Sequence, residues 1–283
     1  MRTRATVAAV VGALACTSAL VAPAAQAADS AATSGTPYTL KVSFSNFKIT
    51  TSIKVGVGGT ISVPVSYTLT HDSTVNTTAS DFYTEPFLYR GTFGDDSTPQ
   101  LYGDDFATCT TTSSTTETCK GTIDIRPAEG ELLNSQAGTW KAAADAVAFN
   151  GQDPTSSSID YSKVGYKEQG DLASTSIRRL AKLTANAGPE PVAKGKTVTT
   201  TGKLTRADWQ SLTYKGFANQ PVKLQFRKAG TTTYTTIKTV YSDAYGNVKA
   251  TGTATYDGYW RLSFAGTSTT ASVNATGDYV DVQ

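Results

Sequence analysis

Apolar and polar residues alternate with a period of two along most of this chain. The clearest case follows an Asp-Gly turn pair near the C-terminus, in the run Trp260, Arg261, Leu262, Ser263 and Phe264. Successive side chains of a β-strand point to opposite faces of its sheet. The run therefore predicts a strand that buries Trp260 and its apolar neighbours and turns the polar residues toward solvent.

The same device occurs in the first half of the chain. Trp140 opens a run in which every second residue is alanine, namely Ala142, Ala144, Ala146 and Ala148. The high helix propensity of alanine makes a short helix the alternative. The alternation and the flanking turns favour a strand, and we expect each half to build its core on one tryptophan.

Further alternating runs predict strands on both sides of a boundary near residue 176. In the first half the apolar parity switches near Ser45 and Asn46, which predicts a bulge or a bend. Pro64 falls on the polar side of the cleanest alternating run and predicts an edge strand or another bulge there. Residues 151–173 are rich in Ser, Asp, Gly and Tyr and are expected to form a loop and a hairpin.

About seven short strands are expected in the second half, a number and spacing typical of an immunoglobulin-like sandwich. Thr, Ser and Gly are abundant, and β-branched and aromatic residues carry most of the hydrophobicity. These features favour strands over helices. The predicted fold class is all-β, with two tandem immunoglobulin-like β-sandwich domains at residues 37–176 and 177–283.

The first residues have the pattern of a secretory signal. Two arginines precede an apolar run, which ends at a small-x-small cleavage site formed by Ala25, Gln26 and Ala27. We predict a signal peptide at residues 1–27, a flexible tether at 28–36, and a secreted, extracellular protein. The chain has no other long apolar run, so no membrane span is expected.

Removal of the signal leaves Cys109 and Cys119 as an even pair in an oxidising compartment. They flank a polar stretch of Thr, Ser and Glu that resembles the tip of a hairpin. We predict a disulfide, which stabilises the fold by about 3 kcal/mol on the chain-entropy model. A metal site is the alternative, but two thiolates and the distant His71 do not complete a tetrahedral shell.

Charge differs strongly between the two halves. Residues 28–176 carry 9 Lys and Arg against 17 Asp and Glu, whereas residues 177–283 carry 14 against 6. The asymmetry favours docking of an acidic domain on a basic one. The alternative is that the basic half contacts an anionic surface such as a cell wall. Nucleic acid is not an expected partner, because the mature charge is near zero and no basic stripe occurs.

Four stretches of the second half carry a resemblance to a known family. They are Gly-Lys-Leu-Thr-Arg at 202–206, Val-Lys-Leu-Gln-Phe-Arg at 222–227, Asp-Gly-Tyr-Trp-Arg at 257–261 and Asp-Tyr-Val-Asp-Val at 278–282. They resemble the immunoglobulin-like module that closes many secreted proteins of actinomycetes such as Streptomyces. That family mostly has no assigned activity, so the resemblance implies architecture, secretion and a Gram-positive source, and it carries no site residues.

Hydrolytic chemistry on a Ser or Cys nucleophile needs an adjacent base, usually a histidine. The only histidine, His71, is followed by Asp72, and adjacent residues of an extended segment point to opposite faces. The sequence also lacks a Gly-x-Ser-x-Gly nucleophile elbow. We therefore predict that the protein is no enzyme but a binding or structural module for a wall polymer, a glycan or a protein partner.

Four aspartates lie close together among aromatic residues of the acidic half: Asp95, Asp96, Asp104 and Asp105. Carboxylate oxygens are ligands for Ca²⁺, and paired carboxylates cleave glycosidic bonds. The alternative function is thus a glycan-active hydrolase or a calcium-dependent carbohydrate-binding protein. The Asp-x-Asp-x-Asp-Gly calcium loop is absent, and aspartates often only cap turns, so solvated turns and no cofactor are the favoured interpretation.

A second candidate contact site lies in the basic half. Trp209, Tyr214 and Phe217 belong to a long predicted loop, residues 206–219. Aromatic side chains on such a loop can stack on sugar rings or contact a protein partner. They can equally fold back as a small satellite core beneath the loop, which is the favoured alternative.

Overall fold

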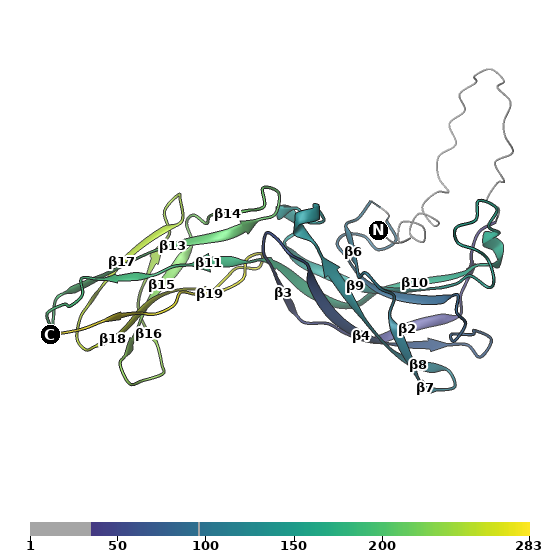
Figure 1. Cartoon of the computed structure of the whole chain (residues 1–283), viewed down its shortest axis with the longest axis horizontal. Helices are drawn as coiled ribbons and strands as arrows, with labels where there is room; N and C mark the ends of the chain where they lie inside the picture. Colours follow the sequence, from purple (N-terminus) through teal and green to yellow (C-terminus); the bar gives the residue numbers. More distant parts are fainter. Residues whose placement is uncertain (1–34, 96) are drawn as a thin grey trace, which may run out of the picture. The chain divides into compact units, whose positions relative to one another are not determined.

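The computed structural model describes residues 35–95 and 97–283 (Figure 1). These residues form twenty strands and three short 3₁₀-helices, which confirms the predicted all-β class. Among them, no helix has the length and hydrophobicity to span a membrane. The predicted signal peptide and most of the predicted tether lie outside the described residues.

The chain divides into two compact units whose segments alternate along the sequence. The first unit holds the residues up to Ile49 together with Ser62–Asp124 and Lys141–Ser174. The second unit holds Thr50–Ile61, Ile125–Trp140 and Thr175–Gln283. Its longest segment begins beside the predicted boundary near residue 176, and two earlier segments of the chain join it.

Two sheets build the first unit. The four-stranded sheet has the order β2-β4-β8-β7, with bounds Val42–Lys48, Ile61–His71, Thr116–Ile125 and Thr108–Ser113. The other sheet has the order β1-β10-β9-β5-β6, with bounds Tyr38–Thr39, Gly165–Arg179, Gly138–Ala148, Phe82–Tyr89 and Gln100–Tyr102. Strand β3, Ser52–Val55, belongs to the second unit, where it pairs in parallel with the last residues of β10.

The predicted bulge near Ser45 and Asn46 is present. The register between β2 and β4 shifts after Ser45, and Asn46 has a positive φ of 51°. The prediction of an edge strand at Pro64 is wrong, because β4 lies between β2 and β8 in its sheet. Pairing of β4 with β2 covers only Ser66–His71, so Pro64, which has no N–H to donate, lies beyond the last β2 partner.

The predicted loop at residues 151–173 is wrong in its second half. Gly165–Arg179 forms one strand of 15 residues, β10. Its polar residues have partners on another sheet: Gln169 Nε2 donates to Phe44 O at 2.9 Å, and Phe44 N donates to Gln169 Oε1 at 3.0 Å. Here a polar side chain, Gln169, bonds to the backbone of another strand and takes the place of an apolar residue in the alternation. The sequence pattern therefore does not indicate a strand.

The alanine-rich run is a strand, β9, as predicted. It is buried on both faces from Ala142 to Ala148. On the second face Ala143 packs with Phe87 and Tyr89 of the neighbouring strand β5. Small side chains on both faces allow aromatic residues of adjacent elements to approach the strand closely.

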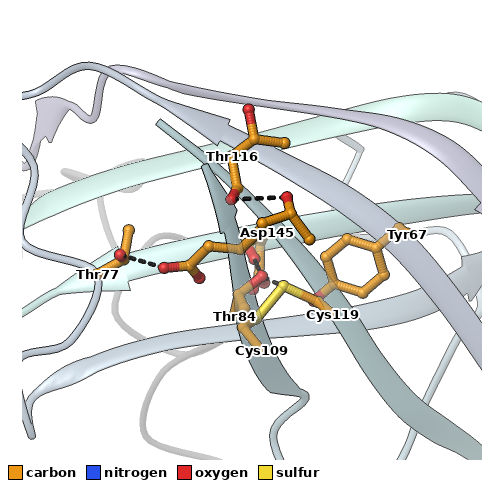
Figure 2. The surroundings of a disulfide bond; sticks show 9 residues. Tyr67, Thr77, Thr84, Cys109, Thr116, Cys119 and Asp145 are labelled. Atoms are coloured by element: carbon orange, nitrogen blue, oxygen red, sulfur yellow. Dashed lines mark hydrogen bonds between the residues drawn. A yellow bond between two sulfur atoms is a disulfide. The ribbon is translucent and has the colours of Figure 1, made fainter. Parts of the chain in front are cut away.

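The predicted disulfide joins Cys109 and Cys119, which stand opposite each other on β7 and β8 with their Cα atoms 4.0 Å apart (Figure 2). Cys119 is fully buried. Glu117, two residues before it, is also buried and accepts a hydrogen bond of 2.5 Å from Thr77 Oγ1. The disulfide therefore links the edge strand of the four-stranded sheet, β7, to its neighbour β8.

Replacing both cysteines by alanine should lower the free energy of unfolding by about 3 kcal/mol, because the unfolded chain regains the entropy of the closed loop. Urea denaturation followed by tryptophan fluorescence measures the loss. The parent protein denatured in the presence of a reductant serves as the control and should lose as much. Unchanged midpoints in both experiments would contradict the prediction.

Two facing sheets also build the second unit. In the first sheet the central strand is β13 (Thr197–Asp208). It pairs with β11 (Ala181–Leu183), β12 (Asn186–Gly188), β14 (Thr213–Gly216) and β17 (Asn247–Thr253). The second sheet has the order β16 (Thr235–Tyr241), β15 (Pro221–Lys228), β18 (Gly258–Phe264) and β19 (Val273–Asn274). Strand β20 (Asp278–Val280) also pairs with β18. The short helices are η1 Pro127–Glu129, η2 Asn134–Gln136 and η3 Tyr161–Lys163.

The strand around Trp260 has the predicted alternation. In β18 Trp260, Leu262 and Phe264 are buried, while the polar residues between them remain half-buried. The apolar face packs in one core cluster with Val198 of β13 and Leu224 of β15. Because one face of β18 packs in this core, the opposite face of β18 is directed outward. The corresponding faces of β15 and β20, which pair with β18, are directed outward as well.

Candidate binding face

Among the described residues, Asp95, Asp104 and Asp105 do not form a group of three metal-ligating side chains. Asp95 is exposed and caps its own turn, accepting hydrogen bonds from Ser97 N at 2.9 Å and Ser97 Oγ at 2.6 Å. These bonds lower the pKa of Asp95. The backbone N–H of Asp104 donates to Asp124 Oδ2, Asp105 is exposed, and Asp96 lies outside the described residues.

Within the described part of the chain, metal-ligating side chains gather in a group of three at one place, Cys109, Glu117 and Cys119. Both sulfurs there belong to the disulfide. A disulfide sulfur is not a thiolate and does not bind a metal as one. Asp95 thus acts as a turn residue, and the calcium site at the four aspartates stays a prediction.

The predicted aromatic contact site is largely buried. Residues 206–219 form the end of β13, a tight turn and strand β14 instead of an open loop. Trp209 is 1% exposed, and its Nε1–H donates to Val55 O at 3.2 Å. Phe217 is 9% exposed beneath Arg206, whose Cζ lies 3.9 Å from the ring centroid. Tyr214 is half-buried with a lysine amine 3.8 Å above its ring. A sugar ring cannot stack on Trp209 or Phe217 in this arrangement.

A buried carboxyl group of the first unit was missed by the sequence analysis. Asp145 on β9 is 7% exposed and stands opposite Glu85 on β5. Burial raises the pKa of Asp145 well above its usual value, and the nearby Glu85 and Glu168 raise it further. The signal in the sequence is one acid in the middle of each of two apolar strands. At 7% exposure Asp145 belongs to the sheet interior, not to an open catalytic site.

Asp145→Asn should raise the melting temperature at neutral pH. The folded-state pKa of Asp145 lies above its unfolded value, so the folded state binds a proton that the unfolded state releases. The contribution of the Asp145 proton to the free energy of unfolding is fully present below the unfolded pKa, about 3.9. This contribution is lost as pH rises through the folded pKa. Asparagine keeps an acceptor for the Glu85 N–H and removes this loss.

Thermal melts from acidic to neutral pH measure the effect of Asp145→Asn. The gain over the parent should grow with pH and vanish in acid. Asp105→Asn is the matched control, because Asp105 is exposed on the same unit. A variant that is less stable than the parent at every pH would contradict the assignment of a proton to buried Asp145.

The outward face of the second unit carries a continuous contact of tyrosine and arginine side chains. Figure 1 shows β15, β16 and β18 side by side in this unit. Arg227 on β15 stands opposite Tyr259 on β18, and Tyr259 stands opposite Tyr279 on β20. Directly opposed residues share a sheet face. Arg261 lies on the same face, two residues after Tyr259.

Ring contacts join these residues into one row. The Arg261 Cζ lies 3.7 Å from the ring centroid of Tyr234, and the Arg227 Cζ lies 5.3 Å from the same ring. The Arg227 Cζ is also 4.1 Å from the ring of Tyr259, whose centroid is 5.2 Å from that of Tyr279. We call the five residues Arg227, Tyr234, Tyr259, Arg261 and Tyr279 the Tyr–Arg face.

Tyr234 crosses the face because the sequence leaves space for it. This residue precedes β16 in the connection from β15, and its hydroxyl approaches Gly277. A Cβ atom on Gly277 would lie 2.1 Å from the Tyr234 hydroxyl oxygen. Glycine at position 277 is thus the sequence feature that permits the tyrosine to lie across the two guanidinium groups.

Hydrogen bonds fix the orientation of both guanidinium groups and leave part of each group unused. Arg261 Nε donates to Gln225 Oε1 at 2.9 Å, and Arg227 Nη1 donates to Thr231 O. Among the described residues neither arginine makes an ion pair with a carboxylate. Guanidinium groups stacked on aromatic rings keep their N–H edges for bidentate contact with a planar anion.

Comparisons with known proteins add little to this geometry. No protein-family model and no curated protein sequence matches the chain. Among solved structures, the D0–D1 domain of intimin is similar with 16% identity and a TM-score of 0.27, over 84% of this chain and 98% of that one. The adhesin InvE of Yersinia pseudotuberculosis has 14% identity and a TM-score of 0.27, over 83% of this chain and 58% of that one. The tandem Ig repeats of Dlar have 10% identity and a TM-score of 0.22, over 87% and 99%.

Proposed function

We propose that this protein is a non-catalytic binding module that acts outside the cell or at its surface and engages its partner through the Tyr–Arg face. The observation that carries the proposal is the row of two guanidinium groups and three tyrosine rings on an outward sheet face. Tyrosine and arginine are among the residue types enriched at energetically important interface positions.

The row is organised before any partner binds. Each guanidinium group rests on a tyrosine ring and donates a hydrogen bond within the protein. Side chains held in this way lose little conformational freedom on binding, which lowers the entropic cost of association. Tyr279, at the end of the row, is 40% exposed and offers an accessible ring.

The extracellular location has its own support. The Cys109–Cys119 disulfide suits an oxidising compartment such as the cell exterior. The predicted signal peptide at residues 1–27 and the resemblance to secreted actinomycete modules point the same way. We therefore extend the proposal to a secreted protein whose second unit presents the binding face.

Affinity electrophoresis of the full chain tests the proposed function. The gels contain a neutral polysaccharide, dextran, or an acidic one, polygalacturonate. At least one polymer should retard the parent protein, and the variant carrying Tyr259→Ala and Tyr279→Ala should migrate as in a polymer-free gel. Tyr245→Ala is the matched control, because Tyr245 is 74% exposed and lies outside the face. Retardation of the double variant to the same extent as the parent would contradict the proposal, as would the absence of any retardation.

A further inference from the structure

We infer that the Tyr–Arg face binds a carboxylate-bearing polysaccharide, a chain of pyranose rings that carry uronate groups. The inference rests on the proposed function, because it names the ligand class of the same face. Three observations support it: the charge of the strands, the unused guanidinium edges and the spacing of the rings.

Three of the four strands that contribute to the face contain no Asp or Glu, namely β15, β16 and β18; the fourth, β20, contains Asp278, whose carboxylate accepts a hydrogen bond from Ala187 N. Lys223, Arg227 and Arg261 lie on the outward side of β15 and β18, whereas Lys238 of β16 stands opposite the core residue Leu224. The second unit as a whole holds 16 Lys and Arg against 8 Asp and Glu. Charge complementarity therefore selects an anionic partner, and a field of one sign also speeds its encounter with the face.

The guanidinium groups select the kind of anion. Their stacked planes are held by Gln225 and by the carbonyl of Thr231, so their remaining N–H groups have a fixed direction. A carboxylate accepts two parallel N–H bonds from such a fork. A partner without carboxylates leaves these N–H donors hydrogen-bonded to water. Their fixed orientation then adds nothing to the affinity.

The tyrosine rings select a polymer of rings. Across adjacent strands, which are about 4.8 Å apart, Arg227 is followed by Tyr259 and then by Tyr279. Along β18, where residues of one face repeat at about 7 Å, Tyr259 is followed by Arg261. This interval is of the order of one pyranose unit, so neighbouring sugar rings can meet a tyrosine and a guanidinium in turn. A row of side chains on a sheet face suits an extended chain, whereas a small ligand is normally enclosed in a pocket.

Other polyanions fit the face less well. A polyol-phosphate chain offers charges for Arg227 and Arg261 but no rings for the tyrosines. Single-stranded nucleic acid offers both bases and phosphates, yet the uncleaved chain carries a net charge of only +2, and the protein is proposed to act outside the cell. Both remain as outcomes of the experiment.

The decisive experiment compares polygalacturonate with its methyl ester, which keeps the sugar backbone and masks the charges. Affinity electrophoresis and isothermal titration of the full chain should show binding to polygalacturonate and at least about tenfold weaker binding to the ester, the effect of losing one charge-assisted contact. Binding to polygalacturonate should weaken as salt is added, because exposed charges are screened.

Variants connect the effect to the face. Arg227→Gln and Arg261→Gln should each weaken polygalacturonate binding by about tenfold. Lys249→Gln removes the same charge from an exposed position on β17 of the other sheet and should bind like the parent. Arg261→Lys keeps the charge but not the planar fork, so its affinity should also fall. Thermal melts verify that each variant is folded, and the comparison of the two polymers on the parent protein needs no variant at all.

The outcomes separate the inference from the proposed function. Equal binding of polygalacturonate and its ester, or binding of dextran alone, would overturn the carboxylate inference and leave the binding module in place. Tighter binding of a polyol phosphate or of single-stranded oligothymidine would also overturn it. Binding of none of these probes would overturn both.

Discussion

Trp260→Ala should lower the free energy of unfolding by about 3–5 kcal/mol, the range for removal of a buried large aromatic side chain. Trp260 is 2% exposed and belongs to the core cluster between the two sheets of the second unit. Its ring lies 4.9 Å from that of Phe226, centroid to centroid. Alanine would leave a cavity between strands whose hydrogen bonds prevent them from closing over it.

The substitution Trp260→Phe distinguishes the cost of the cavity from the effect of removing the indole N–H. The Nε1–H of Trp260 is buried and has no hydrogen-bond partner among the described residues. A buried unsatisfied donor is unfavourable, so phenylalanine, which lacks the N–H, should cost clearly less than alanine. Urea denaturation with the slope compared between variants measures both changes. Equal losses for the two variants would show that the ring volume is not what matters.

Trp140 supplies the contrasting case. Its Nε1–H donates to Gln136 O at 2.8 Å, and the ring is fully buried. Trp140→Phe therefore removes a hydrogen bond as well as part of a ring. The same substitution should be more harmful at position 140 than at position 260, although both tryptophans open an alternating strand in the sequence.

The sequence pattern was sufficient where one face of a strand meets a core. The strand of Trp260 and the alanine-rich strand of Trp140 were predicted because apolar residues occur at every second position. Strand β10 was missed because Gln169 satisfies the backbone of Phe44, 125 residues away. Local periodicity carries no information about such a distant partner.

The same reason explains the outcome for the sites. Trp209 was a candidate contact residue, but its indole N–H bonds to Val55 O, which is 154 residues away in the sequence. The alternation of β18 could place Tyr259 and Arg261 on an outward face. That Tyr234 would cross this face depends on the strand register and on the space at Gly277, and neither can be derived from one sequence.

Gly252→Ala should lower the free energy of unfolding by about 1–3 kcal/mol, the usual cost of overpacking a well-filled core. Gly252 lies on β17, and a Cβ atom there would be 2.4 Å from Cζ3 and 2.5 Å from Cη2 of Trp260. Both atoms belong to a buried ring that has no free space to enter. The clash must exceed the gain of about 0.5–1 kcal/mol that alanine normally brings over glycine in a strand.

A double-mutant cycle identifies the cause. Phenylalanine at position 260 lacks the Cζ3 and Cη2 atoms, so Gly252→Ala should cost much less in a Trp260→Phe background, and the coupling between the two changes should be favourable. Gly58→Ala is the matched control, since a Cβ there has no atom within 4 Å, and its stability should change little. If Gly252→Ala costs the same with either residue at position 260, the strain comes from the backbone of β17 and not from the tryptophan ring.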